Sequence, residues 1–147
     1  MPARSAGPPR CTPRISTPSV LSRFLDLSLD EMGVFAELKT KLPLGITPYY
    51  MSLLHETRPG HPLRRTVVPT VHEFFQMPGE SHDPLGEEGH TQIPGLVHRY
   101  PDRVLFYVTQ NCAMFCRHCT RKRKVADPST AANDAQIDAG IAYVART

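Results

Sequence analysis

Three cysteines within eight residues constrain this chain more than any other feature. Cys112, Cys116 and Cys119 have the spacing Cys-x3-Cys-x2-Cys. They follow Val104 to Thr109, a short apolar and β-branched run that predicts a strand buried on both faces in a parallel sheet. A predicted helix follows over residues 132–147. Together these segments predict one βα unit of an α/β fold. Its cysteines would lie in the loop at the C-terminal end of the strand, where α/β barrels place their chemistry.

The spacing of the cysteines favours an iron–sulfur cluster. A disulfide framework is disfavoured because the number is odd and the fourth cysteine, Cys11, lies about a hundred residues away. A structural zinc site normally needs four ligands from two separated pairs, and His118 is a poor fourth ligand because it adjoins Cys119. Three thiolates on a [4Fe–4S] cluster would leave one iron open to bind a small molecule. Zinc and unliganded thiols remain the alternatives, and reduced thiols imply a reducing compartment.

Proline content and charge exclude several other classes of protein. Fifteen prolines in 147 residues make an all-helical bundle unfavourable. The longest apolar run, residues 104–108, is far too short to cross a membrane. Five prolines and three arginines fall in the first eighteen residues, so we expect residues 1–20 to be a disordered tail rather than a targeting peptide, with Cys11 a bystander.

Residues 21–97 predict a helical arm followed by a connecting loop. Ser28 with Glu31, and Thr70 with Glu73, have the spacing of capping boxes, and Thr47 precedes a proline at a first helical position. After the first box, apolar residues recur at helical spacing at Met32, Phe35 and Leu38. Residues 76–97 are rich in proline, glycine and acids and predict a long loop, while the scattered histidines have no metal-ligand spacing. In the C-terminal helix the apolar residues Ile137, Ile141 and Val144 share one face.

A basic run begins inside the cysteine loop and consists of Arg117, Arg121, Lys122, Arg123 and Lys124. Such runs are usually solvated faces. Its position beside the cysteines, together with the planar fork of arginine, also suits recognition of a carboxylate or phosphate. The same alternatives apply to Arg99 and Arg103. Nucleic-acid binding by a zinc-knuckle-like loop is disfavoured because Phe115 is the only aromatic residue interleaved with these charges.

The cysteine motif resembles the signature of the radical S-adenosylmethionine (SAM) superfamily, and its surroundings resemble the lysine 2,3-aminomutases in register from Leu21 to Thr147. His118 departs from the aromatic residue usual in that superfamily. The segments that carry the resemblance are Ile46-Thr47-Pro48-Tyr49-Tyr50, Asp83-Pro84-Leu85, Pro94 to Phe106, and Cys116-Arg117-His118-Cys119-Thr120-Arg121.

The resemblance implies a cytoplasmic isomerase in which a deoxyadenosyl radical drives the conversion of L-lysine to L-β-lysine. Its cofactors would be a [4Fe–4S] cluster, SAM and pyridoxal phosphate (PLP). Cys112, Cys116 and Cys119 match the cluster ligands, and Arg121 matches the arginine that binds the substrate carboxylate. The residues that match PLP contacts are Arg99, Tyr100 and Arg103. A flavodoxin or ferredoxin as electron donor and a homo-oligomeric state are implied as well.

The resemblance also implies that the chain ends early. Residues 98–147 would be the start of a partial (β/α) barrel, truncated after its first βα unit, while the family's SAM-binding glycines and PLP lysine have no equivalent here. We therefore expect an inactive fragment that binds a cluster poorly. Related aminomutases acting on glutamate, arginine or the lysine attached to a translation factor remain alternatives, as does a three-cysteine metal-binding or nucleic-acid interaction module.

Overall fold

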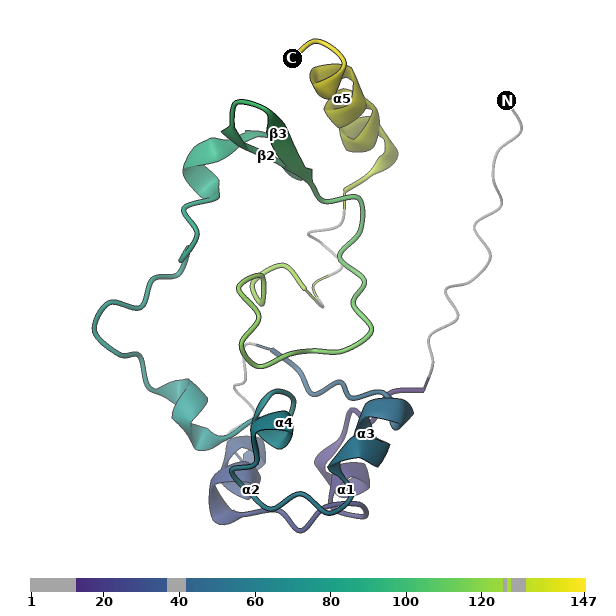
Figure 1. The fold of residues 1–147 in the computed structure, drawn as a ribbon, viewed down its shortest axis with the longest axis vertical. Coiled ribbons are helices and arrows are strands. Elements are labelled where there is room, and N and C mark those ends of the chain that lie inside the picture. The colour runs from purple at the N-terminus through teal and green to yellow at the C-terminus, as the bar shows by residue number, and fades with distance from the viewer. Residues whose placement is uncertain (1–12, 37–41, 126, 128–131) are drawn as a thin grey trace.

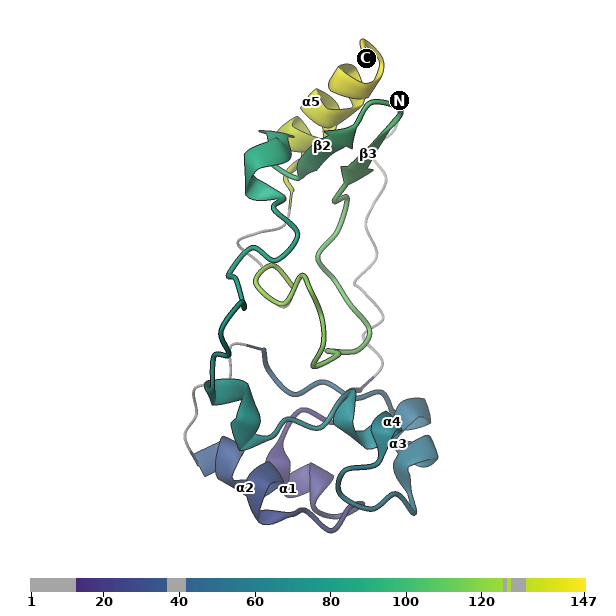
Figure 2. The same cartoon turned by 60° about the vertical axis from the view of Figure 1, so that its left-hand side comes forward.

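A computed structural model describes residues 13–36, 42–125, 127 and 132–147. Helices gather at one end of the molecule, a small sheet and the last helix lie at the other, and the segment that carries the cysteines runs between them (Figures 1 and 2). Among the described residues, no helix has the length and apolar character needed to cross a membrane. The mixture of helices with a sheet agrees with the α/β class, but the sheet has three antiparallel strands and not the predicted parallel pairing.

The helical arm begins before the predicted boundary at Leu21. Ile15 and Ile46 form an isolated antiparallel bridge, with backbone hydrogen bonds of 2.8 and 3.1 Å in the two directions. A short helix follows, because Pro18 stands at a first helical position, where its missing N–H is not needed. Residues 1–12 of the predicted tail lie outside the described residues. The arm contains α1 (Pro18–Leu21), α2 (Leu29–Ala36), α3 (Pro48–Leu54), α4 (Pro62–Arg65) and the 3-10 helix η1 (Val71–Phe74).

Two of the three predicted caps are confirmed. The Ser28 backbone N–H donates to the Glu31 carboxylate at 2.8 Å, and the Glu31 N–H donates to the Ser28 hydroxyl at 3.3 Å. The Thr47 hydroxyl likewise accepts from the Tyr50 N–H at 3.2 Å. The box predicted at Thr70 was wrong, because Thr70 makes no side-chain cap and Glu73 binds an arginine of the cysteine loop instead.

The apolar core of the arm is built from α1, α3 and the segments between the helices, and α2 packs against it through Phe35. In α2 the fully buried apolar residue is Val34, whereas Met32, which the predicted stripe contained, is 53% exposed. Phe35 is half-buried against the core, and Leu38 lies outside the described residues. The buried cluster consists of Ile15, Leu21, Leu25, Leu44, Ile46, Met51, Leu54, Val67 and Val68.

A buried ion pair sits beside this core. The Arg64 guanidinium donates to both carboxylate oxygens of Glu31, at 2.8 and 2.7 Å, and both side chains are almost fully buried. Arg64 also donates to the backbone carbonyls of Thr57 at 2.8 Å and Asp26 at 2.6 Å. A buried charge is tolerated only when it is paired and hydrogen-bonded, and this arginine satisfies both conditions while joining α2 to α4.

The connecting segment contains more structure than the long loop predicted over residues 76–97. A 3-10 helix, η2 (Glu88–His90), leads into β1 (Thr91–Ile93), β2 (Leu96–Tyr100) and β3 (Arg103–Phe106). The strand predicted over 104–109 is therefore shorter. Its prediction as a strand buried on both faces was wrong, since Leu105 is 38% and Val108 60% exposed. A two-residue turn joins β2 to β3, so the antiparallel partner is immediately available, whereas a parallel partner needs a crossover of a dozen or more residues.

Helix α5 (Asp134–Val144) confirms the predicted C-terminal helix. Asn133 and Gln136 form a reciprocal capping box at its start. The helix approaches the sheet through Gly140, which is buried against the Phe106 ring, and through Tyr143, whose hydroxyl lies 2.7 Å from His98 Nδ1. The predicted apolar stripe is only partly covered, because Ile137 is half-buried while Ile141 is 57% and Val144 48% exposed.

Candidate functional site at the cysteine loop

The cysteine loop, residues 112–119, leaves the C-terminal end of β3 by way of residues 107–111 and passes alongside the arm (Figures 1 and 2). Cys112 is exposed, and Cys116 and Cys119 are half-buried. A turn closes the second interval, with the Cys119 N–H donating to the Cys116 carbonyl at 3.0 Å. Since all three are free thiols, the predicted metal ligands are chemically available.

The three thiols are close enough to influence one another. Burial raises the pKa of Cys116, and the neighbouring Cys112 and Cys119 raise it further because adjacent thiolates repel. The Cys112 thiol donates to the Met114 carbonyl at 2.9 Å. Within the described residues, no three metal-binding side chains converge on one point. The donor set suits an iron–sulfur cluster, since three thiolates that repel one another are stabilised by a shared cationic partner.

Phe115 anchors the first half of the loop to the arm. Its N–H donates to the Gly45 carbonyl at 3.0 Å, and its ring is buried against Gly45 so closely that a Cβ there would lie 2.6 Å from a ring carbon. Arg14 also contacts the loop here. Its guanidinium lies 4.8 Å from the Phe115 ring centroid and donates to the Cys112 carbonyl at 2.9 Å. A glycine at position 45 is therefore required for this close approach.

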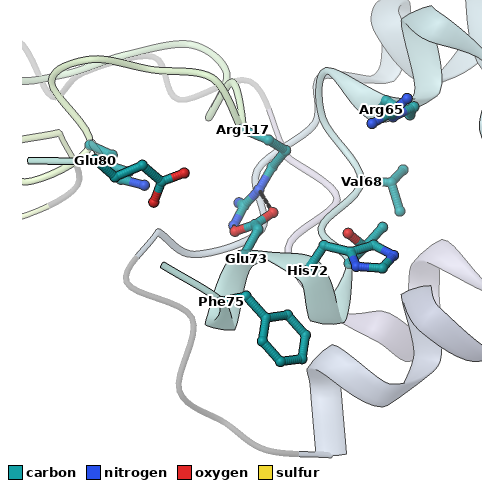
Figure 3. Close-up of a pocket in the computed structure, with 9 residues that line it drawn as sticks. Arg65, Val68, His72, Glu73, Phe75, Glu80 and Arg117 are labelled. Atoms are coloured by element: carbon teal, nitrogen blue, oxygen red, sulfur yellow. Dashed lines mark hydrogen bonds and ion pairs between the residues drawn. The ribbon is translucent and has the colours of Figure 1, made fainter. Parts of the chain in front are cut away.

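Arg117 anchors the second half. Its backbone N–H donates to the Thr66 carbonyl at 2.7 Å, and its guanidinium forms a two-pronged pair with the Glu73 carboxylate. The same guanidinium donates to the carbonyls of Leu42 at 3.0 Å and Pro43 at 3.1 Å. Figure 3 shows Arg117 and Glu73 bound to each other in the wall of a cavity. The volume of this cavity is about 290 Å³.

Three members of the basic run after the last cysteine, Arg121, Arg123 and Lys124, are paired with the connecting segment, whereas Lys122 is exposed. Arg123 contacts the carboxylates of Asp83, at 2.9 Å, and Glu88. Asp83 also accepts from the Glu88 N–H, and this hydrogen bond, ahead of the positive charge of Arg123, lowers the pKa of Asp83. Neither reading of the run from sequence included these internal partners.

Arg121 belongs to a compact polar cluster. Its Nε donates to the Tyr107 hydroxyl at 2.8 Å and its Nη2 to the Glu87 carboxylate at 3.2 Å. The Tyr107 hydroxyl donates to Glu87 at 2.6 Å, and Lys124 lies 3.8 Å from the same carboxylate. Burial and the bond to Glu87 raise the pKa of Tyr107. Nη1 of Arg121 has no hydrogen-bond partner in the part of the chain that the structure describes, so one edge of the guanidinium is available to a ligand.

Arg99, Tyr100 and Arg103 lie together at the turn between β2 and β3, all of them exposed. Arg103 forms a two-pronged pair with Asp102 and lies over the Tyr100 ring at 5.6 Å, and Arg99 donates to the Leu85 carbonyl at 2.7 Å. Four residues of extended chain, about 13 Å, separate Arg103 from Tyr107. The structure thus brings Tyr100 and Arg103 into contact, whereas the Arg99 side chain binds the connecting segment at Leu85.

Sequence reasoning missed Glu73, Glu87 and Tyr107. The signal for Glu87 was a charge imbalance: a run of cations within residues 117–124 needs counter-ions, and residues 80–88 carry four acids. Glu73 lies outside that segment and was assigned to the predicted cap at Thr70. Tyr107 was counted only as one apolar residue of a strand, and nothing in the local pattern indicated that its hydroxyl would be used.

Comparison with known proteins gives the chain's relatives. It is 40% identical over 134 residues to the L-lysine 2,3-aminomutase of Acetoanaerobium sticklandii, which covers 91% of this chain and 32% of that protein. It is 42% identical over 137 residues to the L-lysine 2,3-aminomutase of Bacillus subtilis, covering 92% of this chain and 29% of the relative. The chain is related to the lysine 2,3-aminomutases. A glutamate 2,3-aminomutase of Clostridioides difficile is also similar, at 34% identity over 89% of this chain and 31% of its own length.

No family model matches the chain. The chain spans about a third of the length of the aminomutases it matches. Because the relatives are aminomutases, which are isomerases acting on amino acids, the resemblance in the cysteine loop and its surroundings is confirmed at the level of the family.

Proposed function

We propose that this chain supplies the cluster-binding and carboxylate-binding part of a radical SAM, PLP-dependent 2,3-aminomutase that converts L-lysine to L-β-lysine. The observation that carries the proposal is the Cys-x3-Cys-x2-Cys loop, with three free thiols held between the arm and the paired basic run, in a chain related to the lysine 2,3-aminomutases. A cytoplasmic location, a homo-oligomeric state and a flavodoxin or ferredoxin as electron donor are part of the same proposal.

The cysteines and Arg121 would bind different groups. Cys112, Cys116 and Cys119 would hold the [4Fe–4S] cluster through their thiolates. When bound, the cluster with SAM supplies a carbon-centred radical, and PLP carries the amino acid. The free edge of Arg121 would bind the substrate α-carboxylate, a planar task that suits a guanidinium.

The PLP phosphate would lie against the guanidinium groups of Arg99 and Arg103, with the Tyr100 ring beside the cofactor. Both arginines are exposed at one hairpin turn, and arginine is a preferred partner of phosphate. The proposal requires the rest of the cofactor to extend from this turn toward Arg121, since the two places are about four strand residues apart.

Anaerobic reconstitution with iron and sulfide tests the proposal. Because the chain is expected to bind a cluster poorly, we expect a brown product at low yield, whose charge-transfer absorption disappears in Cys112→Ser, Cys116→Ser and Cys119→Ser, with Cys11→Ser as the matched control that keeps it. A colourless product that contains zinc in stoichiometric amount would instead support the three-cysteine metal-binding module, and retention by nucleic acid would support the interaction module.

Glutamate is the second candidate substrate, because the Clostridioides difficile relative is named glutamate 2,3-aminomutase. Both substrates have the α-carboxylate that Arg121 would bind, so this arginine does not discriminate between them. The chain alone is expected to be inactive, so the test uses a full-length aminomutase that carries this segment: supplying it with lysine and glutamate separately, and identifying the β-amino acid formed, decides between the two.

A further inference from the structure

We propose that Arg117 and Glu73 are positioning residues for the cysteine loop: through this pair the helical arm fixes the loop backbone before any metal is bound. The link to cluster binding rests on the proposed function, whereas the preset loop itself does not. Arg117 lies between the second and third cysteines and Glu73 lies in η1 of the arm, and the proposed function assigns neither of them to metal or substrate.

Every nitrogen of the Arg117 guanidinium is used by the arm. Nε and Nη2 bind the two oxygens of Glu73, while Nη1 and Nη2 also donate to the Leu42 carbonyl, and Nη1 to that of Pro43. The Arg117 side chain is only 6% exposed. A charged side chain so deeply buried holds its geometry, because leaving its partners would strand a buried charge.

The backbone of the loop is tied at the same place. The Arg117 N–H donates to the Thr66 carbonyl and the Phe115 N–H to the Gly45 carbonyl, at 2.7 and 3.0 Å. These two bonds lie on either side of Cys116 and use none of the three sulfur atoms. The arm thus holds the chain on both sides of the central thiol and leaves the thiols themselves for a ligand.

Presetting matters because ordering a flexible loop opposes binding. A loop that is already fixed by the arm binds its cluster without that cost. The planar fork explains why position 117 needs arginine: a lysine ammonium is a compact point charge and cannot meet a carboxylate and two carbonyls from one plane. We therefore expect Arg117→Lys to behave like a loss of the residue.

The first measurement is hydrogen exchange of the metal-free chain. Glu73→Gln and Arg117→Lys should speed exchange of the Phe115 and Arg117 amides by about tenfold or more, the factor that loss of a charged hydrogen bond gives. Asp102→Asn is the matched control, because it breaks an equally two-pronged arginine pair, with Arg103, on the exposed hairpin. Leu21→Ala controls for general destabilisation, since it empties a fully buried site in α1.

The second measurement is iron and acid-labile sulfide per chain after anaerobic reconstitution. We expect at least a twofold loss in Glu73→Gln and Arg117→Lys and unchanged content in both controls at a temperature where all variants are folded.

Unchanged amide exchange in the two variants, or an equal change at these amides in Leu21→Ala, would overturn the preset loop. Altered exchange with unchanged iron content would overturn its role in cluster binding. Absence of a cluster from the unmodified chain would refute the proposed function instead, while the exchange data still decide whether the loop is preset.

Discussion

At the scale of single residues, buried polar side chains organise this molecule as much as apolar ones do. Arg64 joins two helices of the arm, and Arg117 joins the cysteine loop to the arm. Glu87 forms an ion pair with Arg121 of the basic run. Each of these groups is paired, which is the condition for burying charge at all. Arg64 offers the sharpest test, because among the described residues it is the only cation paired with Glu31.

Replacing Arg64 with methionine should destabilise the arm by about 3–5 kcal/mol, because it leaves the Glu31 carboxylate buried without its counter-ion. Removing both charges in Arg64→Met/Glu31→Met should cost less than the single change, since no unpaired charge remains. Urea unfolding followed by circular dichroism measures both. A double variant as unstable as the single one would contradict this account of the pair.

The Tyr107 cluster predicts a pH dependence. Burial, together with the bond to Glu87, raises the pKa of Tyr107 above its ordinary value of 10.0, so the folded state holds this proton more tightly than the unfolded state. The stability this provides is complete below that value and is lost as the pH rises through the folded pKa. The unfolding free energy of the unmodified chain should therefore fall relative to Tyr107→Phe as the pH rises above about 10. Tyr49→Phe, at a residue 75% exposed, is the control, and a constant difference across this range would contradict the prediction.

At the scale of elements, the sequence predicted what is decided locally. The caps at Ser28 and Thr47 and the existence of α5 depend on residues three or four positions apart, and all were confirmed. The strand after Tyr100 was recognised, but its partner was not, because antiparallel pairing depends on the turn between β2 and β3 and not on the apolar run itself. The arginine partners of Glu73 and Glu87 were not predicted for a related reason: each arginine is more than thirty residues away from its glutamate along the chain.

The contact between α5 and the sheet gives a prediction at this scale. A Cβ at Gly140 would lie 2.4 Å from Cζ of Phe106, so Gly140→Ala must displace the ring, and we expect a net loss of about 1 kcal/mol despite the better helix propensity of alanine. In a Phe106→Leu background the same change should be stabilising, because the ring is gone and only the propensity gain remains. A double-mutant cycle by denaturant unfolding measures the coupling, and additive effects would contradict the packing.

At the scale of the whole molecule, the arm and the sheet are separate groups of elements (Figure 1). Phe115 and Arg117 tie the cysteine loop to the arm on either side of Cys116, and the basic run after the loop binds the connecting segment. This explains why the site was only partly predictable. The thiols and arginines were visible as a motif, but their supports come from two parts of the chain that meet only in the folded molecule. Two apolar side chains of α5, Ile141 and Val144, also remain exposed.

That surface predicts self-association. Ile141 and Val144 are adjacent on α5 and about half-exposed, although such a stripe is normally buried. The unmodified chain should therefore associate reversibly as its concentration rises and bind a hydrophobic dye. The double variant Ile141→Gln/Val144→Gln should reduce both, since glutamine keeps helix propensity while removing the apolar face. Leu29→Gln/Tyr49→Gln is the control, because it removes two even more exposed apolar side chains from the arm, 84% and 75% exposed. Sedimentation measures the association, and an equal reduction by the two double variants would show that contact through α5 is not its cause.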